Sequence, residues 1–385
     1  MDNPKKSHDT SSSMQTSRRR FLKTSAVAAG TAIGLSASCP SNVLAVDQKT
    51  SKGRSITIAG YKLDRVEALI DGRVKVDGFD AKFEIDSIGK MNTHIFSGPQ
   101  TRQVTEIGLS PFMLAYANDG FRDYTLIPVF PLRLFRHKSI FVRPDSGIQS
   151  PEDLRGRKVA TPGFSSTSLT WIRGIVQHEY GVKPEEIQWF VSSKDSSAKL
   201  SGGASKFENI IPKNLSVTQG PPGQDESDML LTGQVDALFH AVEPKAYVEG
   251  NPRVVRLFPD FRTVEQAYFA KTGIFPIMHA VAIRKDFIAA HPGFPKAVFK
   301  AYSQAKKLMY EHMKKLAWVT VSLPWVAQEI EETRALMGEN YWPYGIEPNR
   351  KSLEALFQYS YEQGLAAKKL TIEELFHPST LELME

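Results

Sequence analysis

Short apolar runs alternate with amphipathic stretches along most of this sequence, and this alternation limits the possible folds more than any other feature. The apolar runs have the length of buried strands, and the stretches between them, such as residues 64–71 and 169–180, repeat apolar side chains with helical spacing. Strands that alternate with helices are typical of an α/β protein with a mostly parallel sheet. The predicted strands fall into two groups, one at residues 56–59, 81–85, 105–109 and 126–130 and one at residues 159–161, 187–191 and 235–239.

Two extended, proline-containing runs, residues 131–142 and 272–283, connect these groups. The chain is therefore predicted to leave a first lobe, build a second and return, with a ligand cleft between two hinged lobes. We expect lobe 1 to comprise residues 46–135 and 280–385 and lobe 2 to comprise residues 136–279. Within lobe 2, residues 192–227 are rich in Ser, Gly and Pro and predict an irregular excursion. The pattern is helical from Phe287 onward, which predicts C-terminal helices.

An export signal precedes the predicted lobes. Residues 17–23 read Ser-Arg-Arg-Arg-Phe-Leu-Lys, and paired arginines before Phe-Leu-Lys are typical of a twin-arginine signal peptide. The apolar stretch at residues 24–37 is shorter than the roughly 20 residues of a membrane span, and Ala45 is the small residue expected at a cleavage site. We therefore predict a signal peptide at residues 1–45, a periplasmic location, and the twin-arginine translocase as a partner during export.

Removal of this leader changes the charge and the cysteine content. It takes away six basic and two acidic side chains, which leaves 42 basic and 40 acidic ones and lowers the formal net charge from +6 to +2. No block rich in Lys and Arg remains, so nucleic acid is not expected as a partner. The single cysteine, Cys39, also lies in the leader, and Ser36 three positions before it argues against lipidation. The remaining chain has no disulfide or cysteine nucleophile, so its stability depends on its core.

Seven motifs, in sequence order, match one family. They are PVFP at 128–131, FRH at 135–137, DLRG at 153–156, WIRG at 171–174, RLFPD at 256–260, TGIFPIMH at 272–279 and YWPYGIEPNR at 341–350. Over residues 56–381 the chain resembles the 4,5-dihydroxyphthalate decarboxylase family, which has the type II periplasmic binding protein fold. Residues 232–237 also resemble the strand-entry pattern of binding proteins of ABC importers. The resemblance implies a two-lobed α/β fold with two hinge crossings, and it leaves the activity open because this fold serves both transport and catalysis.

The sequence and the resemblance together suggest two functions from different classes. Export and hinged lobes favour a solute-binding protein that captures a small anionic ligand, an aromatic carboxylate, for an ABC-type importer with an ABC permease as partner. The resemblance implies instead a decarboxylase that removes CO₂ from a dihydroxylated aromatic acid, as a cofactor-independent or metal-assisted carboxy-lyase. The family's enzymes carry an acidic residue after the strand-ending proline, whereas Gly163 and Phe164 follow Pro162 here, which favours binding. The sequence contains no cofactor motif, and we expect no cofactor.

Ligands of open α/β sheets bind beyond the carboxyl ends of the strands, and four segments of the chain qualify. Tyr61 and Arg65 follow the first predicted strand, Ser110 follows the third, and His240 follows a strand of lobe 2. The fourth segment places four consecutive hydroxyls at a helix start, where free N–H groups and the helix dipole favour an anion. Ordinary N-capping of that helix needs only one of them. These candidate ligand-binding residues are Ser165, Ser166, Thr167 and Ser168.

The first crossing carries Arg133, Arg136 and His137. Arginine binds carboxylates through two parallel hydrogen bonds, so this cluster suits an anionic ligand. In an extended run the two arginines face opposite sides, and we expect one to contact the ligand and the other to join the lobes. We predict that Arg136, inside the Phe-Arg-His motif, contacts the ligand.

Histidines and aromatic residues supply the remaining candidates. His279 on the returning crossing would meet His137 and His240 in the cleft, as a metal site or as acid–base groups. No two of them have the sequence spacing of metal ligands, so we predict no metal. In an enzyme, the candidates that protonate the ring carbon are His137, His279, Asp64 and Tyr61. We expect the aromatic residues of 341–344 to pack the C-terminal helices onto lobe 1 rather than to line the ligand site.

Overall fold

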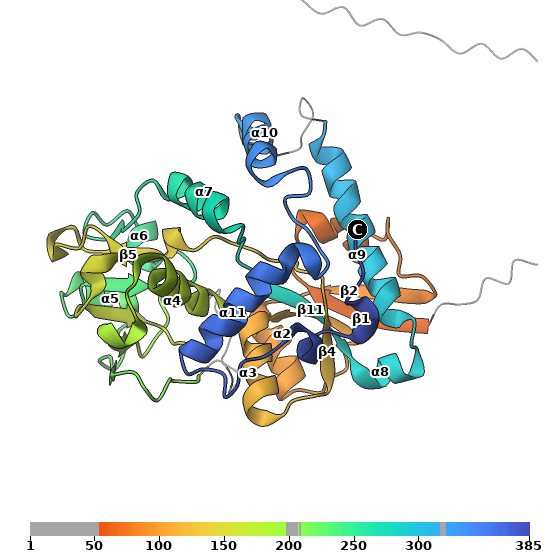
Figure 1. The fold of residues 1–385 in the computed structure, drawn as a ribbon, viewed down its shortest axis with the longest axis horizontal. Helices are drawn as coiled ribbons and strands as arrows, with labels where there is room; N and C mark the ends of the chain where they lie inside the picture. Colours follow the sequence, from red (N-terminus) through yellow and green to blue (C-terminus); the bar gives the residue numbers. More distant parts are fainter. Residues whose placement is uncertain (1–53, 198–206, 208, 316–320) are drawn as a thin grey trace, which may run out of the picture. The chain divides into compact units, whose positions relative to one another are not determined.

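The computed structural model describes residues 54–197, 207, 209–315 and 321–385, so the predicted signal peptide lies outside the described residues. The chain divides into residues 1–50 and 51–385, and every described element belongs to the second unit. Its strands form two sheets that lie side by side, with helices packed on them (Figure 1). Among the described residues, no helix is both long enough and apolar enough to cross a membrane.

The first sheet has the strand order β2-β1-β3-β11-β4. Its strands are β1 (Arg54–Gly60), β2 (Phe79–Ile85), β3 (Val104–Gly108), β4 (Tyr124–Ile127) and β11 (His279–Arg284). β1 pairs in parallel with β2 and β3, whereas β11 pairs antiparallel with β3 and β4. The register places His279 opposite Gly108, so the start of β11 meets the carboxyl end of β3. This end of the sheet is where a ligand is expected.

The second sheet has the order β10-β5-β9-β6-β7-β8. Its strands are β5 (Ile140–Val142), β6 (Lys158–Thr161), β7 (Gln188–Val191), β8 (Val217–Gln219), β9 (Ala237–Phe239) and β10 (Val255–Arg256). β6 pairs in parallel with β7 and β9, and β5 pairs antiparallel with β9. β8 extends the parallel set beside β7. The segment predicted to be irregular, residues 192–227, is therefore partly regular, because it contributes the edge strand β8.

The chain crosses between the sheets twice, after β4 and before β11, in the order predicted from the sequence. The two crossings contact each other through an antiparallel bridge between Arg133 and Ile277. The Leu134 N–H donates to the Pro276 carbonyl at 3.1 Å, and the Met278 N–H donates to the Leu132 carbonyl at 2.9 Å. The lobe boundaries at residues 135/136 and 279/280 stay predictions. The bridge shows that the two crossings lie side by side and run antiparallel.

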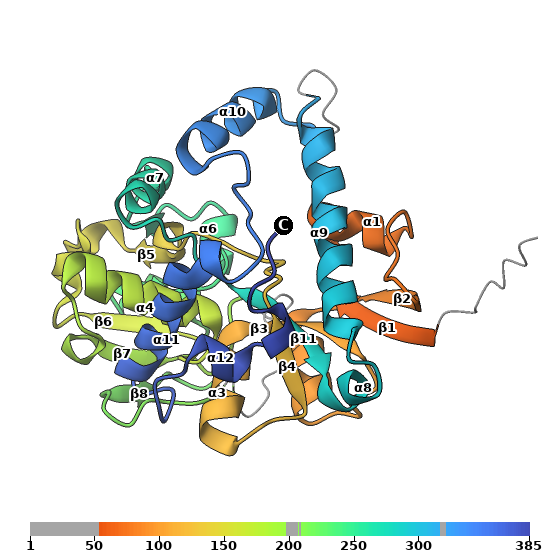
Figure 2. The ribbon, with the colours of Figure 1, turned by 45° about the vertical axis from the view of Figure 1, so that its right-hand side comes forward.

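Helices cover the sheets and fill the C-terminal part of the chain (Figure 2). α4 contacts both α3 and α11, and α9 packs along α1. The Trp171 indole N–H of α4 donates to the Ile277 carbonyl at 2.9 Å, which attaches this helix to the second crossing. The helices are α1 (Glu67–Ile70), α2 (Ile88–Phe96), α3 (Leu109–Asp119), α4 (Thr167–Tyr180), α5 (Glu226–Leu231), α6 (Lys245–Val248), α7 (Phe261–Thr272), α8 (Lys285–Ala290), α9 (Phe294–Met313), α10 (Val326–Met337), α11 (Arg350–Glu362) and α12 (Ile372–Leu375).

The starts of two helices affect the site. α3 begins at Leu109 with Gly108 as its N-cap, so Ser110 lies in the first turn and does not cap the helix. α4 begins two residues earlier than predicted, and the Ser166 hydroxyl accepts the Leu169 N–H at 3.3 Å. Ser166 is therefore the one hydroxyl used as an N-cap, and Thr167 and Ser168 belong to the first turn of the helix.

The aromatic residues near Pro343 pack as expected. Tyr344 is buried in the core formed by α9 and the first sheet. The Trp342 indole N–H donates to the Phe130 carbonyl at 2.8 Å, and the Arg65 guanidinium lies 3.8 Å from the centre of the Trp342 ring. These contacts join the C-terminal segment to the first sheet.

Candidate functional site

A pocket of about 190 Å³ lies at the carboxyl ends of strands from both sheets. Tyr61 follows β1, Gly108 ends β3, and Val242 follows β9. Both crossings also reach the pocket, the first through Arg136 and the second through Met278. Because parallel strands present their carboxyl ends at one edge, this convergence is the arrangement expected of a ligand site in α/β sheets.

Arg136 is the cation of this pocket. Its side chain is buried, and it donates to the Ala241 carbonyl at 2.7 Å and to the Met278 sulfur at 2.8 Å. Its Nε is buried without a hydrogen-bond partner, and no ion pair with a carboxylate is formed within the described part of the chain. Burial lowers the pKa of Arg136 to about 10, so the guanidinium stays charged at neutral pH. Glu265 and Glu243 attract Arg136 from beyond ion-pair distance, and a buried charge without a closer partner is costly unless a ligand supplies the opposite charge.

The first turn of α4 lines the same pocket through Ser166, Thr167 and Ser168. The first N–H groups of a helix have no partner within the helix, and the dipole favours an anion beside them. The Thr167 hydroxyl accepts the Ser110 N–H at 2.9 Å, and the Ser168 hydroxyl donates to the Met278 sulfur at 3.4 Å. Arg136 and this helix terminus therefore give one pocket two groups that attract an anion.

His279 and Tyr61 also line the pocket, and both contact Glu106 of β3. Glu106 is buried, and its carboxylate lies 2.6 Å from His279 Nδ1 and accepts the Tyr61 N–H at 2.9 Å. The Tyr61 hydroxyl accepts the Ile88 N–H at 3.2 Å, and burial raises its pKa above the ordinary value. Holding Nδ1 against a carboxylate leaves Nε2 as the nitrogen free for acid–base chemistry.

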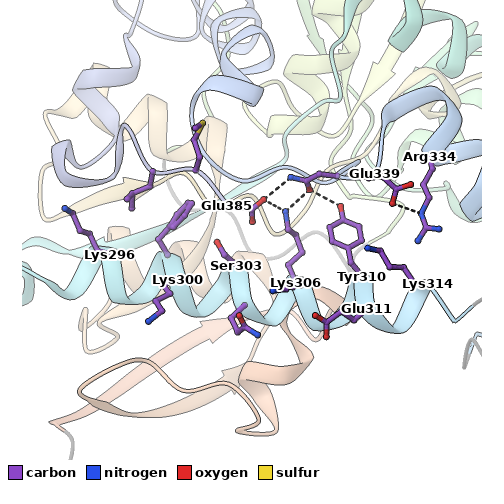
Figure 3. A pocket seen from close by; sticks show the side chains of 16 residues that line it. Lys296, Lys300, Ser303, Lys306, Tyr310, Glu311, Lys314, Arg334, Glu339 and Glu385 are labelled. Carbon is purple, nitrogen blue, oxygen red and sulfur yellow. Dashed lines mark hydrogen bonds and ion pairs between the residues drawn. The ribbon is translucent and has the colours of Figure 1, made fainter.

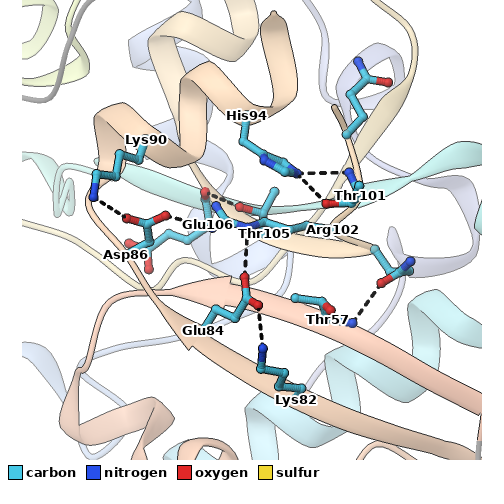
Figure 4. A network of polar contacts seen from close by, with 12 residues as sticks. Thr57, Lys82, Glu84, Asp86, Lys90, His94, Thr101, Arg102, Thr105 and Glu106 are labelled. Carbon is cyan, nitrogen blue, oxygen red and sulfur yellow. Dashed lines mark hydrogen bonds and ion pairs between the residues drawn. The ribbon is translucent and has the colours of Figure 1, made fainter. Parts of the chain in front are cut away.

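Glu106 borders a polar network on β2, β3 and α2 (Figure 4). Arg102 bridges Glu84 at 3.4 Å and Asp86 at 2.8 Å, and the Thr105 hydroxyl donates to the Glu106 carbonyl at 3.0 Å. The network ties the end of β2 to Arg102, which lies just before β3. Sequence reasoning missed Glu106, although an acidic residue within the strand predicted at residues 105–109 was a signal for it.

The sequence of this chain is similar to those of known proteins. A 4,5-dihydroxyphthalate decarboxylase from Comamonas testosteroni is 31% identical over 328 residues, which cover 85% of this chain and 97% of the relative. The chain belongs to the 4,5-dihydroxyphthalate decarboxylase family. A member of the family from Pseudomonas putida is 30% identical over 206 residues, which cover 54% of this chain and 77% of that protein. A family model described as NMT1/THI5 like matches residues 133–211.

The fold is that of type II periplasmic binding proteins, as predicted. The periplasmic sulfonate-binding protein SsuA of a sulfonate ABC transporter from Methylobacillus flagellatus KT has a similar structure, with a TM-score of 0.51. The similarity covers 86% of this chain and 93% of that protein at 13% sequence identity. At this identity the likeness concerns the fold alone, while membership of the decarboxylase family comes from the sequence.

Several predicted site residues lie outside the pocket and have partners within the protein. Arg65 donates to the Pro131 carbonyl at 2.6 Å and pairs with Asp64 at 2.8 Å. Arg133 donates to Asn349 at 2.6 Å and to the Phe275 carbonyl at 2.5 Å, and burial lowers its pKa to about 9. Ser110 is buried, with its hydroxyl 3.5 Å from that of Thr170. The structure thus places Arg136 in the pocket and Arg133 outside it.

The three histidines do not meet. His137 is buried beside Tyr180, Phe258 and Tyr268, and both of its ring nitrogens lack a hydrogen-bond partner. Burial lowers the pKa of His137 to about 4. Ser165 is likewise buried, with its hydroxyl unpartnered. His240 lies behind the pocket wall at Ala241 and Val242, where it contacts Asp195 and Glu226.

A larger cavity of about 710 Å³ lies along α9 (Figure 3). Lys306 is buried at its floor and contacts Glu385, Asn340 at 3.0 Å and the Trp342 carbonyl at 2.7 Å. Arg334 and Glu339 also line the cavity and lie 3.7 Å apart. Lys306 therefore has a carboxylate partner within the protein, whereas Arg136 has none among the described residues, although further lysines, among them Lys296 and Lys314, also line this cavity.

Proposed function

We propose that this protein is an exported solute-binding protein that captures a small aromatic carboxylate for an ABC-type importer. The observation that carries the proposal is the buried guanidinium of Arg136, which reaches the pocket without a carboxylate partner among the described residues. A ligand carboxylate would supply that partner through charge-assisted hydrogen bonds. The first turn of α4 favours the same sign of charge.

The shape of the pocket supports a compact ring rather than a long chain. Its volume is about 190 Å³, and its apolar lining includes Ile88, Leu132, Leu134 and Met278. Apolar walls with a few converging polar groups are typical of small-molecule sites. The predicted signal peptide and the fold shared with a sulfonate-binding protein support capture outside the cytoplasm and delivery to a permease.

The test is calorimetric titration of the purified protein with phthalate, 4,5-dihydroxyphthalate and cyclohexane-1,2-dicarboxylate. We expect the two aromatic acids to bind and the saturated analogue, which carries the same two carboxylates, to bind at least about tenfold more weakly, a difference of about 1.4 kcal/mol. We also expect no release of CO₂ from 4,5-dihydroxyphthalate. Equal affinity for the saturated acid would contradict an aromatic ligand, and absence of binding by all three would contradict the proposal.

Decarboxylation is the second candidate, and the Glu106–His279 pair favours it. The family relatives named 4,5-dihydroxyphthalate decarboxylase support the same reaction. In this reaction the carbon–carbon bond to one carboxylate breaks, CO₂ leaves, and the electron pair stays on the ring carbon. That carbon needs a proton, which His279 would donate from Nε2 while Glu106 holds Nδ1. Arg136 would anchor the carboxylate that is retained.

Release of CO₂ from 4,5-dihydroxyphthalate by the wild type would favour this second function. In that case His279→Asn should abolish turnover and leave binding of phthalate within about threefold, because the lost group acts on the proton rather than on the carboxylate. Glu106→Gln should lower kcat more than it raises KM, as expected of a positioning residue. CO₂ release that survives His279→Asn would contradict this mechanism.

A further inference from the structure

Three side chains that could hold a metal ion converge behind the wall of the ligand pocket. Asp195 lies in the loop after β7, Glu226 is the first residue of α5, and His240 follows β9. Their ligand atoms all lie within 4.8 Å of one another. Neighbours of these residues, Ser197 and Ala241, line the pocket, so the cluster and the pocket share a wall.

The two distances from His240 to the carboxylates lie on either side of the value expected for a metal site. His240 Nε2 lies 3.1 Å from an Asp195 carboxylate oxygen and 3.9 Å from a Glu226 carboxylate oxygen. Ligands about 2.1 Å from a tetrahedral Zn²⁺ ion are about 3.4 Å apart, between these two values. One imidazole and two carboxylates are ligands that Zn²⁺ and Mn²⁺ accept.

The protein also orients the imidazole as metal sites do. His240 Nδ1 lies 2.8 Å from the Val242 carbonyl oxygen, to which a protonated Nδ1 donates, and 3.2 Å from the Val242 nitrogen, whose N–H an unprotonated Nδ1 accepts. With Nδ1 protonated, the bond to the carbonyl is of the kind that fixes the tautomer of a ligating histidine and turns Nε2 toward the ion. Here Nε2 is the nitrogen that faces the two carboxylates.

Burial distinguishes the cluster from a chance group of surface charges. Glu226 is 0% exposed and His240 is 1% exposed, and both carboxylate oxygens of Glu226 are held, one by the Ser192 hydroxyl and one by the Ser196 N–H at 2.9 Å. Hydrogen bonds to the carboxylate are the second-shell support that metal ligands require. The Ser196 hydroxyl is buried without a hydrogen-bond partner, which leaves a polar atom available beside the cluster.

We propose that Asp195, Glu226 and His240 form a binding site for one divalent transition-metal ion, with Zn²⁺ as the ion of choice. The site is separate from Arg136 and does not depend on the identity of the organic ligand. The three ligands come from the loop after β7, from α5 and from the segment after β9, so the ion would tie these three parts of the chain together.

The experiment is titration of the chelator-treated, full-length protein with Zn²⁺, and in parallel with Mn²⁺ and Mg²⁺, together with metal analysis after dialysis. We expect one Zn²⁺ per chain and weaker binding of Mg²⁺. Glu226→Gln and Asp195→Asn should each weaken Zn²⁺ binding at least about 100-fold, because loss of even a second-shell partner costs 10–100-fold. The matched control is His178→Asn, which removes the histidine of another carboxylate pair, 2.7 Å from Glu362.

Thermal unfolding of each metal-free variant shows whether it folds. If Glu226→Gln does not fold, Asp195→Asn decides the outcome, because the Asp195 side chain is 24% exposed and its replacement disturbs the core less. Absence of Zn²⁺ binding by the wild type would overturn the proposal. It would also fail if Asp195→Asn bound Zn²⁺ like the wild type, or if His178→Asn lost binding to the same degree. Preference for Mg²⁺ would overturn the assignment to a transition metal.

Discussion

Arg136 and Arg133 lie three residues apart on one crossing, and their environments predict different consequences of mutation. Arg136 reaches the pocket, whereas Arg133 is held by Asn349 and the Phe275 carbonyl. Arg136→Met keeps much of the aliphatic stem and removes the charge, so we expect carboxylate affinity to fall about 10–100-fold, the value of one or two charge-assisted hydrogen bonds. Calorimetric titration with phthalate measures this.

Arg133→Met is the matched control. We expect it to change phthalate affinity less than about threefold, since its partners lie outside the pocket, and to lower the free energy of unfolding by about 1–3 kcal/mol because Asn349 loses a buried donor. Equal losses of affinity in the two variants would show that Arg136 does not contact the ligand.

His137 predicts a pH dependence of stability. Burial lowers its pKa from 6.5 to about 4, so between these pH values the unfolded chain binds a proton that the folded protein does not. The free energy of unfolding should therefore fall as the pH drops from 6.5 to 4, by at most roughly 3 kcal/mol. His137→Phe, which suits the aromatic surroundings, should reduce this slope. Urea unfolding at a series of pH values tests it, and an identical slope in both proteins would contradict the assignment.

At the scale of elements, the approach of α4 to α11 depends on a glycine. A Cβ added to Gly174 of α4 would lie 2.0 Å from a ring carbon of Tyr359 on α11. Gly174→Ala should therefore lower the free energy of unfolding by about 1–3 kcal/mol, because the helices must separate. Gly293→Ala is the control, since a Cβ there meets nothing within 4 Å. Chemical denaturation measures both, and equal stability of the two variants would contradict close packing of these helices.

The sequence predicted the elements better than the contacts between them. Buried strands and amphipathic helices leave local patterns, whereas β8 has three residues, two of them exposed, and leaves none. Arg136 was found because a motif contains it. Glu106 was missed because its role in the site depends on its contact with His279, which is 173 residues away in the sequence. Asp195 and Glu226 lie within the segment interpreted as irregular, and only the folded chain brings them to His240.

At the scale of the whole molecule, one pocket serves both candidate functions. A binding protein needs Arg136 and the start of α4, and a decarboxylase needs the same anchor together with Glu106 and His279. The fold therefore does not choose between them. The location of the protein does bear on the choice, because an importer's binding protein acts outside the cytoplasm.

Export is tested by replacing the arginines at residues 18–20 with lysine, which keeps the charge and removes the twin-arginine motif. In the bacterial host we expect the wild-type protein in the periplasmic fraction and the lysine variant in the cytoplasm, measured by immunoblot of cell fractions. The control replaces Lys5 and Lys6 with arginine, outside the motif, and should be exported normally. Retention of the wild type in the cytoplasm would remove the support that export gives to solute binding and would shift the balance toward decarboxylation.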